Sequence, residues 1–146
     1  MGKGTESATK QRYEALSDFR YRLRTFLRFS EDIARAEGIT VLQYQLLLHT
    51  QGFPERDWAS IGEIAERLQA QPNGVVALVS RCEEAGLVRR VPGVKDRRLV
   101  EVHLTPLGRR KLANLVEQHA DQLSELAQVL RLASIESPGS QAPTTL

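Results

Sequence analysis

The chain has 146 residues, of which 41% are hydrophobic, 26% charged and 5% aromatic, and its formal net charge is +2. This length and apolar content suit one domain with a core built mainly from aliphatic side chains. No stretch approaches the roughly 20 apolar residues of a membrane helix, and no secretion-signal pattern opens the chain. The single cysteine, Cys82, cannot form an internal disulfide. We therefore expect a soluble, cytoplasmic protein without a membrane partner.

The basic residues are concentrated in one segment. Residues 71–111 contain nine Lys or Arg and four Asp or Glu, a net charge of +5, whereas residues 1–70 sum to zero and residues 112–146 to −3. A basic block of this kind is typical of a surface that binds nucleic-acid phosphates. It is equally compatible with a solvated face whose charge is balanced by acids elsewhere in the fold.

The N-terminal part is predicted to be helical. Residues 1–10 are small and polar and are expected to form a disordered tail. From about Tyr13 to Glu37, apolar residues recur every three or four positions without an intervening Pro or Gly. This spacing predicts one long amphipathic helix. Gly38 is expected to end that helix, and Thr40 to cap the next one.

Two short helices are predicted in the middle of the chain. After a short strand at residues 58–59, Ser60 and Glu63 form a capping-box pattern that starts the first helix. Residues 69–71 connect it to the second helix, which begins with Pro72. The buried side of this second helix is expected to consist of Val75, Leu78, Val79 and Cys82.

The apolar period then changes from helical to alternating. Residues 87–91 and 99–104 are predicted strands, and the loop between them contains three basic residues, which indicates a β-hairpin with a basic tip. Thr105 and Pro106 are expected to cap and start a second long helix. Its apolar stripe ends at Ala133, and a second disordered tail is expected after it.

This order of elements predicts a winged helix-turn-helix. The expected fold class is mainly α with a small β-hairpin wing (α+β). We assign residues 38–105 to a DNA-binding domain, 11–37 and 106–133 to a helical dimerisation region, and 1–10 and 134–146 to disordered tails. The two long helices carry more apolar surface than a winged core can bury, so we expect them to pair with a second copy of the chain.

The second helix of such a pair can enter the major groove of DNA, and the hairpin tip can reach the adjacent minor groove. On the helix, amides can pair with bases or phosphates, small residues permit close approach, and arginine binds phosphate or guanine. The expected DNA-binding residues are Gln71, Asn73, Gly74, Ala77 and Arg81 on the helix and Lys95, Asp96, Arg97 and Arg98 on the hairpin. Ser80 is expected on the same exposed side. Asp96 is expected to brace Arg98 or to cap the turn, although a simple turn preference would also account for it.

The residues of the wing carry a resemblance to a known family. They are Glu84-Ala85-Gly86-Leu87-Val88-Arg89-Arg90, Lys95-Asp96-Arg97-Arg98 and Val102-His103-Leu104-Thr105. This segment resembles the multiple antibiotic resistance regulator (MarR) family, whose wing carries an Asp-x-Arg motif that Asp96 and Arg98 match. The resemblance extends over about residues 12–132. One departure is that many members have Ser or Thr at the positions of Gly74 and Val76, and a polar or basic residue at Ala77, so fewer direct base contacts are expected here.

The resemblance implies a homodimer whose terminal helices intertwine and whose two winged domains bind successive major grooves of a pseudo-palindromic operator in double-stranded DNA. It also implies repression of nearby genes that is relieved by a small aromatic or phenolic ligand. Family members place such a ligand between the long helices and the winged domain. Residues of this chain that could line that site are Tyr44, His49 and Trp58, although each could equally serve the core.

Two other classes of function are compatible with parts of the sequence. A winged helix can bind only protein, but such a module does not need an arginine-rich wing tip. Cys82 could make the protein a redox-sensing regulator, yet it lies on the predicted buried side of its helix. We expect no enzyme activity, because phosphate-binding loops and nucleophile motifs are missing. We also expect no cofactor and no metal, since His49, His103 and His119 lack ligand spacing.

Overall fold

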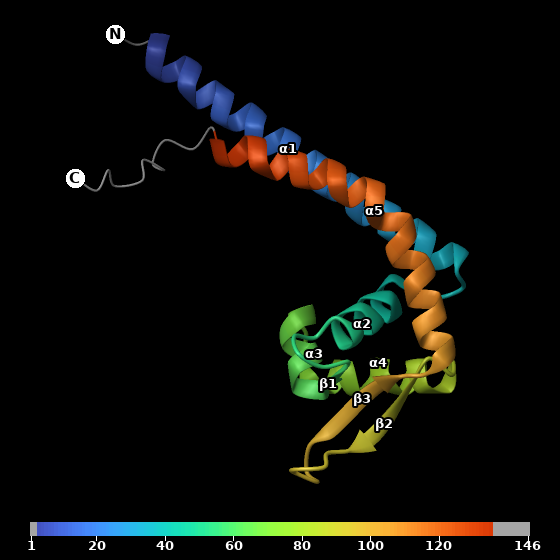
Figure 1. The fold of residues 1–146 in the computed structure, drawn as a ribbon. Coiled ribbons are helices and arrows are strands. Elements are labelled where there is room, and N and C mark those ends of the chain that lie inside the picture. Colours follow the sequence, from blue (N-terminus) through green and yellow to red (C-terminus); the bar gives the residue numbers. More distant parts are fainter. Residues whose placement is uncertain (1–2, 136–146) are drawn as a thin grey trace, which may run out of the picture. The chain divides into compact units, whose positions relative to one another are not determined.

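The computed structural model describes residues 3–135 (Figure 1). Within this part of the chain, five helices and three strands follow one another as α1 (Lys3–Ala36), α2 (Val41–Gln51), β1 (Trp58–Ser60), α3 (Ile61–Leu68), α4 (Pro72–Glu84), β2 (Val88–Pro92), β3 (Val100–Leu104) and α5 (Pro106–Ile135). The mainly helical fold with a small antiparallel wing confirms the predicted fold class. The described residues divide into two compact units: residues 30–118 form one, and residues 3–29 with residues 119–135 form the other.

Local capping signals place the ends of the central helices where the sequence predicts them. The amides of Gln43 and Glu63 donate to the side chains of Thr40 and Ser60, and the carboxamide and carboxylate of the same two residues accept the cap amides in return. Burial by itself raises the pKa of Glu63, but the bonds with Ser60 and the ion pair with Arg56 outweigh it and hold that pKa below its usual value. These caps begin α2 and α3 at Val41 and Ile61.

The turn between α3 and α4 is short because both of its ends are fixed. Gln69 adopts a left-handed conformation with φ of 51°, and its amide donates to the last turn of α3. Pro72 occupies the first turn of α4, where its missing amide hydrogen has no helical partner to lose. The buried residues of α4 are Val75, Leu78, Val79 and Cys82, as predicted.

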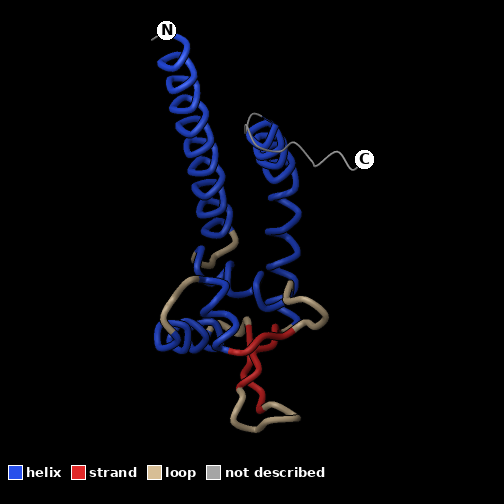
Figure 2. The backbone as a smooth tube through the Cα atoms, turned by 90° about the vertical axis from the view of Figure 1, so that its left-hand side faces the viewer, coloured by secondary structure: helices blue, strands red, loops and turns tan. Residues whose placement is uncertain are grey.

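The three strands form one antiparallel sheet in the order β1-β3-β2. Trp58 pairs with His103 across β1 and β3, and Arg90 pairs with Val102 across β2 and β3. The β2–β3 hairpin extends beyond the helices of its unit and ends in an irregular loop (Figures 1 and 2). Side chains from α2, α3, α4, the sheet and the start of α5 fill one core; its largest fully buried members are Leu46, Leu47, Ile64, Leu87 and Leu115.

The start of α5 is held against the turn that precedes β2. The Thr105 hydroxyl donates to the Gly86 carbonyl at 2.6 Å and accepts the Gly108 amide at 3.1 Å, and the Thr105 amide donates to the Leu87 carbonyl at 2.9 Å. A β-carbon at Gly108 would overlap that same carbonyl oxygen. Glycine is therefore required here by the close approach of two backbones.

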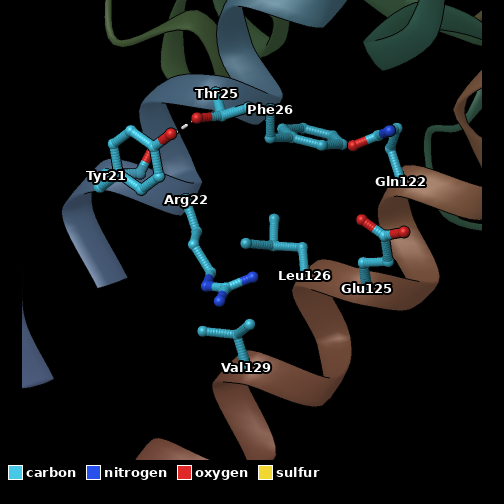
Figure 3. A pocket seen from close by; sticks show the side chains of 8 residues that line it. All are labelled: Tyr21, Arg22, Thr25, Phe26, Gln122, Glu125, Leu126 and Val129. Atoms are coloured by element: carbon cyan, nitrogen blue, oxygen red, sulfur yellow. Dashed lines mark hydrogen bonds between the residues drawn. The ribbon is translucent and has the colours of Figure 1, made fainter. Parts of the chain in front are cut away.

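In the second unit, α1 and α5 lie side by side. The rings of Phe26 and Phe29 stand edge-on to the ring of His119, at centroid distances of 5.8 and 5.7 Å. A cavity of about 100 Å³ lies between α1 and α5 in this unit (Figure 3). It is lined by Tyr21, Arg22, Thr25, Phe26, Gln122, Glu125, Leu126 and Val129.

Some element boundaries differ from the sequence predictions. The helix α1 begins at Lys3 rather than near Tyr13, so residues 3–10 are helical and not a tail. Their sequence lacks proline, and its one glycine, Gly4, lies in the first turn, so nothing in it stops the helix from extending. The last helix includes Ser134 and Ile135, and the remainder of the predicted C-terminal tail lies outside the described residues. No helix between Lys3 and Ile135 is long and apolar enough to cross a membrane.

Candidate nucleic-acid interface

The side of α4 opposite its core residues is exposed. The predicted contact residues on this helix and just before it are all exposed: Gln71, Asn73, Gly74, Ala77 and Arg81. Gly74 has an ordinary helical backbone, and a β-carbon added there would meet nothing within 4 Å. Because glycine in a helix costs about 0.5–1 kcal/mol relative to alanine, the fold itself gains nothing from Gly74. The position is open to close approach by another molecule.

Ser80 is an exception to the predicted exposed side. It is half-buried, and its hydroxyl donates to the Val76 carbonyl at 3.1 Å and accepts a hydrogen bond from Arg90 at 2.8 Å. The prediction for Ser80 was wrong, because a side chain from β2 covers it. Sequence spacing along α4 could not reveal this, since Arg90 lies ten residues away and belongs to another element.

The wing tip has a defined geometry. The amide of Gly93 donates to the Leu99 carbonyl and the amide of Leu99 to the Asp96 carbonyl, at 2.8 and 3.1 Å. One oxygen of Asp96 accepts both the backbone amide of Arg98 at 3.0 Å and its Nε at 3.4 Å. Asp96 thus both caps the turn and braces Arg98, as predicted. The Arg98 side chain is nevertheless 94% exposed, so it projects from the tip.

The acids of the basic segment are largely occupied by neighbours. Glu83 pairs with Arg90, Asp96 with Arg98, and the buried Glu101 with His103, which leaves Glu84 without an ion pair in residues 3–135. Several cations of the same segment make no ion pair within that range: Arg81, Arg89, Lys95, Arg97 and Arg110. The net positive charge of this segment is therefore carried by side chains that are free to bind an anion.

The three residues expected to line a ligand site differ in their burial and in their contacts. Tyr44 is buried, and this burial raises its pKa. His49 is half-buried, and burial together with the charge of Arg67 lowers its pKa. Trp58 stacks on His103, and the guanidinium of Arg56 lies 3.9 Å from the centroid of the Trp58 ring. None of the three lines the cavity between α1 and α5, so their role as ligand contacts stays a prediction.

The histidines and Cys82 also differ in their environments. His103 contacts Glu101, and His119 packs between two phenylalanine rings. No group of three His, Cys, Asp or Glu residues in the described chain could hold a metal ion. Cys82 is fully buried in the core, as its place on α4 predicted, and burial raises its pKa to about 11.

The environment of Cys82 leads to an expected result for its reactivity. Because only the thiolate attacks disulfides and peroxides, the folded protein should react very slowly with an aromatic disulfide reagent between pH 7 and 9. The denatured chain should titrate one thiol rapidly, which provides the control. Fast reaction of the folded protein, with a midpoint near the ordinary thiol pKa, would restore the redox-sensing alternative.

The winged segment is similar in sequence to known proteins. Residues 37–99 match the sequence model of the MarR family. A stretch of 48 residues is 38% identical to the HTH-type transcriptional repressor MdtR of Bacillus subtilis; it covers 33% of this chain and 31% of that protein's length. The chain thus matches about a third of the length of this relative.

The fold is also shared with solved structures. The disulfide-formed structure of AbfR is similar with a TM-score of 0.72 at 20% identity, over 92% of each chain. A mutant of MepR from S. aureus, bound to an oligodeoxyribonucleotide, gives a TM-score of 0.62 at 21% identity, over 80% of this chain and 82% of that one. At such identities the similarity establishes the fold. Residues 37–99, from the end of α1 to the wing, are thus similar to the MarR family, and the chain shares the fold of these solved structures.

Proposed function

We propose that the chain is a DNA-binding transcriptional regulator that acts as a homodimer on a pseudo-palindromic operator, and that it is a repressor. The family match, the name of the B. subtilis relative and the oligonucleotide bound to the MepR mutant support this proposal. The family is one of regulators, in agreement with the prediction that the chain is not an enzyme.

The observation that carries the proposal is the separation of charges on residues 71–111. The acids Glu83, Asp96 and Glu101 are each bound to a neighbouring side chain, whereas Arg81, Lys95 and Arg97 are exposed and make no ion pair in the part of the chain that the structure describes. Because these acids are bound to other side chains, they do not neutralise the three exposed cations. The free cations flank an exposed helix and a projecting hairpin, which is the pattern that binds a duplex in two grooves.

Each exposed residue is assigned a role by its chemistry. Asn73 near the start of α4 would read base edges, and Gly74 and Ala77 would let the helix approach closely. The phosphates would be anchored by Gln71, Arg81 and Arg97, and Lys95 would add positive charge at the wing.

The wing tip would reach the minor groove. Arg98, held by Asp96, would enter this groove, where the negative potential is strongest over narrow A·T-rich stretches.

Homodimer formation is supported by apolar side chains that α1 and α5 leave in solvent. The most exposed of them are Tyr13, Leu16 and Tyr21 on α1 and Leu123 on α5. Several exposed apolar residues on adjacent helices of one unit form the kind of surface that a partner covers. A second copy of the chain would also supply the second winged domain that a pseudo-palindromic site requires.

Genomic fragments selected by the purified protein, followed by fluorescence-anisotropy titration of the enriched duplex, test this function. The expected result is saturable binding of two chains per duplex that weakens as salt rises. Absence of any enriched or bound duplex would favour the protein-interaction module instead. Relief by a small aromatic or phenolic ligand stays a prediction from the resemblance, and release of the duplex on addition of aromatic carboxylates or phenols in the same assay would support it.

Arg81 gives a specific prediction within that assay. If each Arg81 neutralises one phosphate, Arg81→Ala should reduce the slope of log affinity against log salt by about 0.9 for each arginine removed. Because a homodimer carries two copies of this arginine, the slope should fall by roughly 1.8 in total. Arg35→Ala, which removes an exposed cation at the end of α1, provides the matched control. An unaltered slope for Arg81→Ala would exclude the phosphate role.

A further inference from the structure

Arg90 of β2 joins the wing to α4. Its backbone amide donates to Glu83 Oε2 at 2.9 Å, and its Nη1 donates to Oε1 of the same carboxylate at 3.2 Å. Its Nη2 donates to the Val76 carbonyl at 3.1 Å and to Ser80 Oγ at 2.8 Å. We call this set of interactions the Arg90 clamp. It connects β2 to two successive turns of α4.

The clamp uses groups that the regular elements leave open. In the sheet order β1-β3-β2, β2 is an edge strand, and the amide of Arg90 is satisfied by Glu83 rather than by another strand. The Val76 carbonyl already takes part in helix α4 and accepts the guanidinium as an additional donor. Arginine is suited to this task because its planar fork reaches three acceptors at once, whereas lysine presents a single point charge.

We propose that Glu83 and Arg90 are positioning residues for DNA binding: they fix the wing at a set place beside α4, so that the helix and the tip meet their grooves together. The inference rests on the proposed function. It places within the DNA-binding unit an acid that, by charge alone, should repel DNA. A hairpin free to move relative to α4 would lose conformational entropy on binding, and a preformed arrangement avoids that cost.

Removal of the Glu83 carboxylate distinguishes a positioning role of the Arg90 clamp from a purely electrostatic effect of this acid on DNA binding. Glu83→Gln deletes a negative charge near the duplex, which by itself would tighten binding. If the clamp positions the wing, affinity for the selected duplex should instead fall by about threefold or more, the range of couplings within one hydrogen-bonded network. Glu84→Gln removes the neighbouring acid, which makes no ion pair in residues 3–135, and should leave affinity unchanged or slightly higher.

A second pair of variants keeps the charge constant. Arg90→Lys should weaken binding, while Arg89→Lys on the same strand, where the side chain is exposed and makes no ion pair in the described residues, should have little effect. The salt slope should stay the same for Arg90→Lys, because the protein still neutralises the same phosphates. If Arg90 instead bound a phosphate directly, Glu83→Gln would release it and strengthen binding.

The coupling between Glu83 and Arg98 in DNA binding tests the positioning role, because a role of Glu83 in stability alone would leave the effect of Arg98→Ala on affinity unchanged. In the unaltered protein, Arg98→Ala should weaken binding strongly; in the Glu83→Gln background the loss of affinity caused by Arg98→Ala should shrink by about twofold or more, because the wing is no longer held in place. Hydrogen exchange of peptides from α4 and β2 should quicken in Glu83→Gln while the unfolding midpoint stays nearly constant.

The outcomes distinguish this inference from the function on which it rests. Failure of the unaltered protein to bind any selected duplex overturns the proposed function and the positioning role with it. Binding by the unaltered protein, with Glu83→Gln equal to or tighter than Glu84→Gln, overturns the positioning role alone. Strict additivity of Glu83→Gln and Arg98→Ala also overturns it.

Discussion

Arg98→Ala is expected to weaken binding to the selected duplex by about 1–3 kcal/mol, roughly 5- to 150-fold, the range of a specific groove contact. The guanidinium projects from the wing tip with its side chain 94% exposed, while Asp96 fixes its direction through the backbone amide and Nε. The duplex would therefore meet an arginine that is already oriented. Anisotropy titration at fixed salt measures the decrease in affinity.

The fold should not respond to this substitution. Because the Arg98 side chain is bonded only to Asp96 among the described residues, the free energy of unfolding of Arg98→Ala in a urea titration should lie within about 0.5 kcal/mol of that of the unaltered protein. Asp96→Asn leaves the arginine in place but weakens its brace, and should cost less affinity than Arg98→Ala. Equal affinity of Arg98→Ala and the unaltered protein would remove Arg98 from the interface, and the wing would then have to act through Lys95 and Arg97.

Gly108→Ala is expected to destabilise the winged unit by about 2 kcal/mol or more, a value at the upper part of the range for overpacking. The added β-carbon would overlap the Leu87 carbonyl oxygen and lie 3.1 Å from its carbonyl carbon. Both are backbone atoms next to a fully buried side chain, so neither can move aside as a flexible side chain would. Relief of the overlap requires α5 to shift away from the turn and to disturb the bonds made by Thr105.

Gly74→Ala is the matched control, because both glycines occupy the third position of a helix that begins with proline. At Gly74 a β-carbon meets nothing within 4 Å, so stability should rise by about 0.5–1 kcal/mol. Chemical denaturation monitored by circular dichroism compares the two variants. If Gly108→Ala unfolds at the same urea concentration as the unaltered protein, the close approach of α5 to Leu87 does not limit stability.

Much of the fold follows from signals that lie within a few residues of one another. The capping box of Ser60 and Glu63, Pro72 at the start of α4 and Thr105 before α5 each act over one helical turn, so the sequence alone located these helix starts. The buried side of α4 followed from helical periodicity, and the bracing of Arg98 by Asp96 from a separation of two residues. The family resemblance also rested on one short stretch of the chain, residues 84–105.

The tertiary structure decided what depends on contacts between distant segments. Periodicity placed Ser80 on the exposed side of α4, but Arg90 covers it from another element. Nothing near Gly108 in sequence indicates the backbone of Leu87, which lies 21 positions earlier. The start of α1 at Lys3 was missed because polar composition was read as disorder, although such residues can form an exposed helix. Hydrogen bonds and close approaches between elements leave no periodic trace in the sequence, so only the folded chain reveals them.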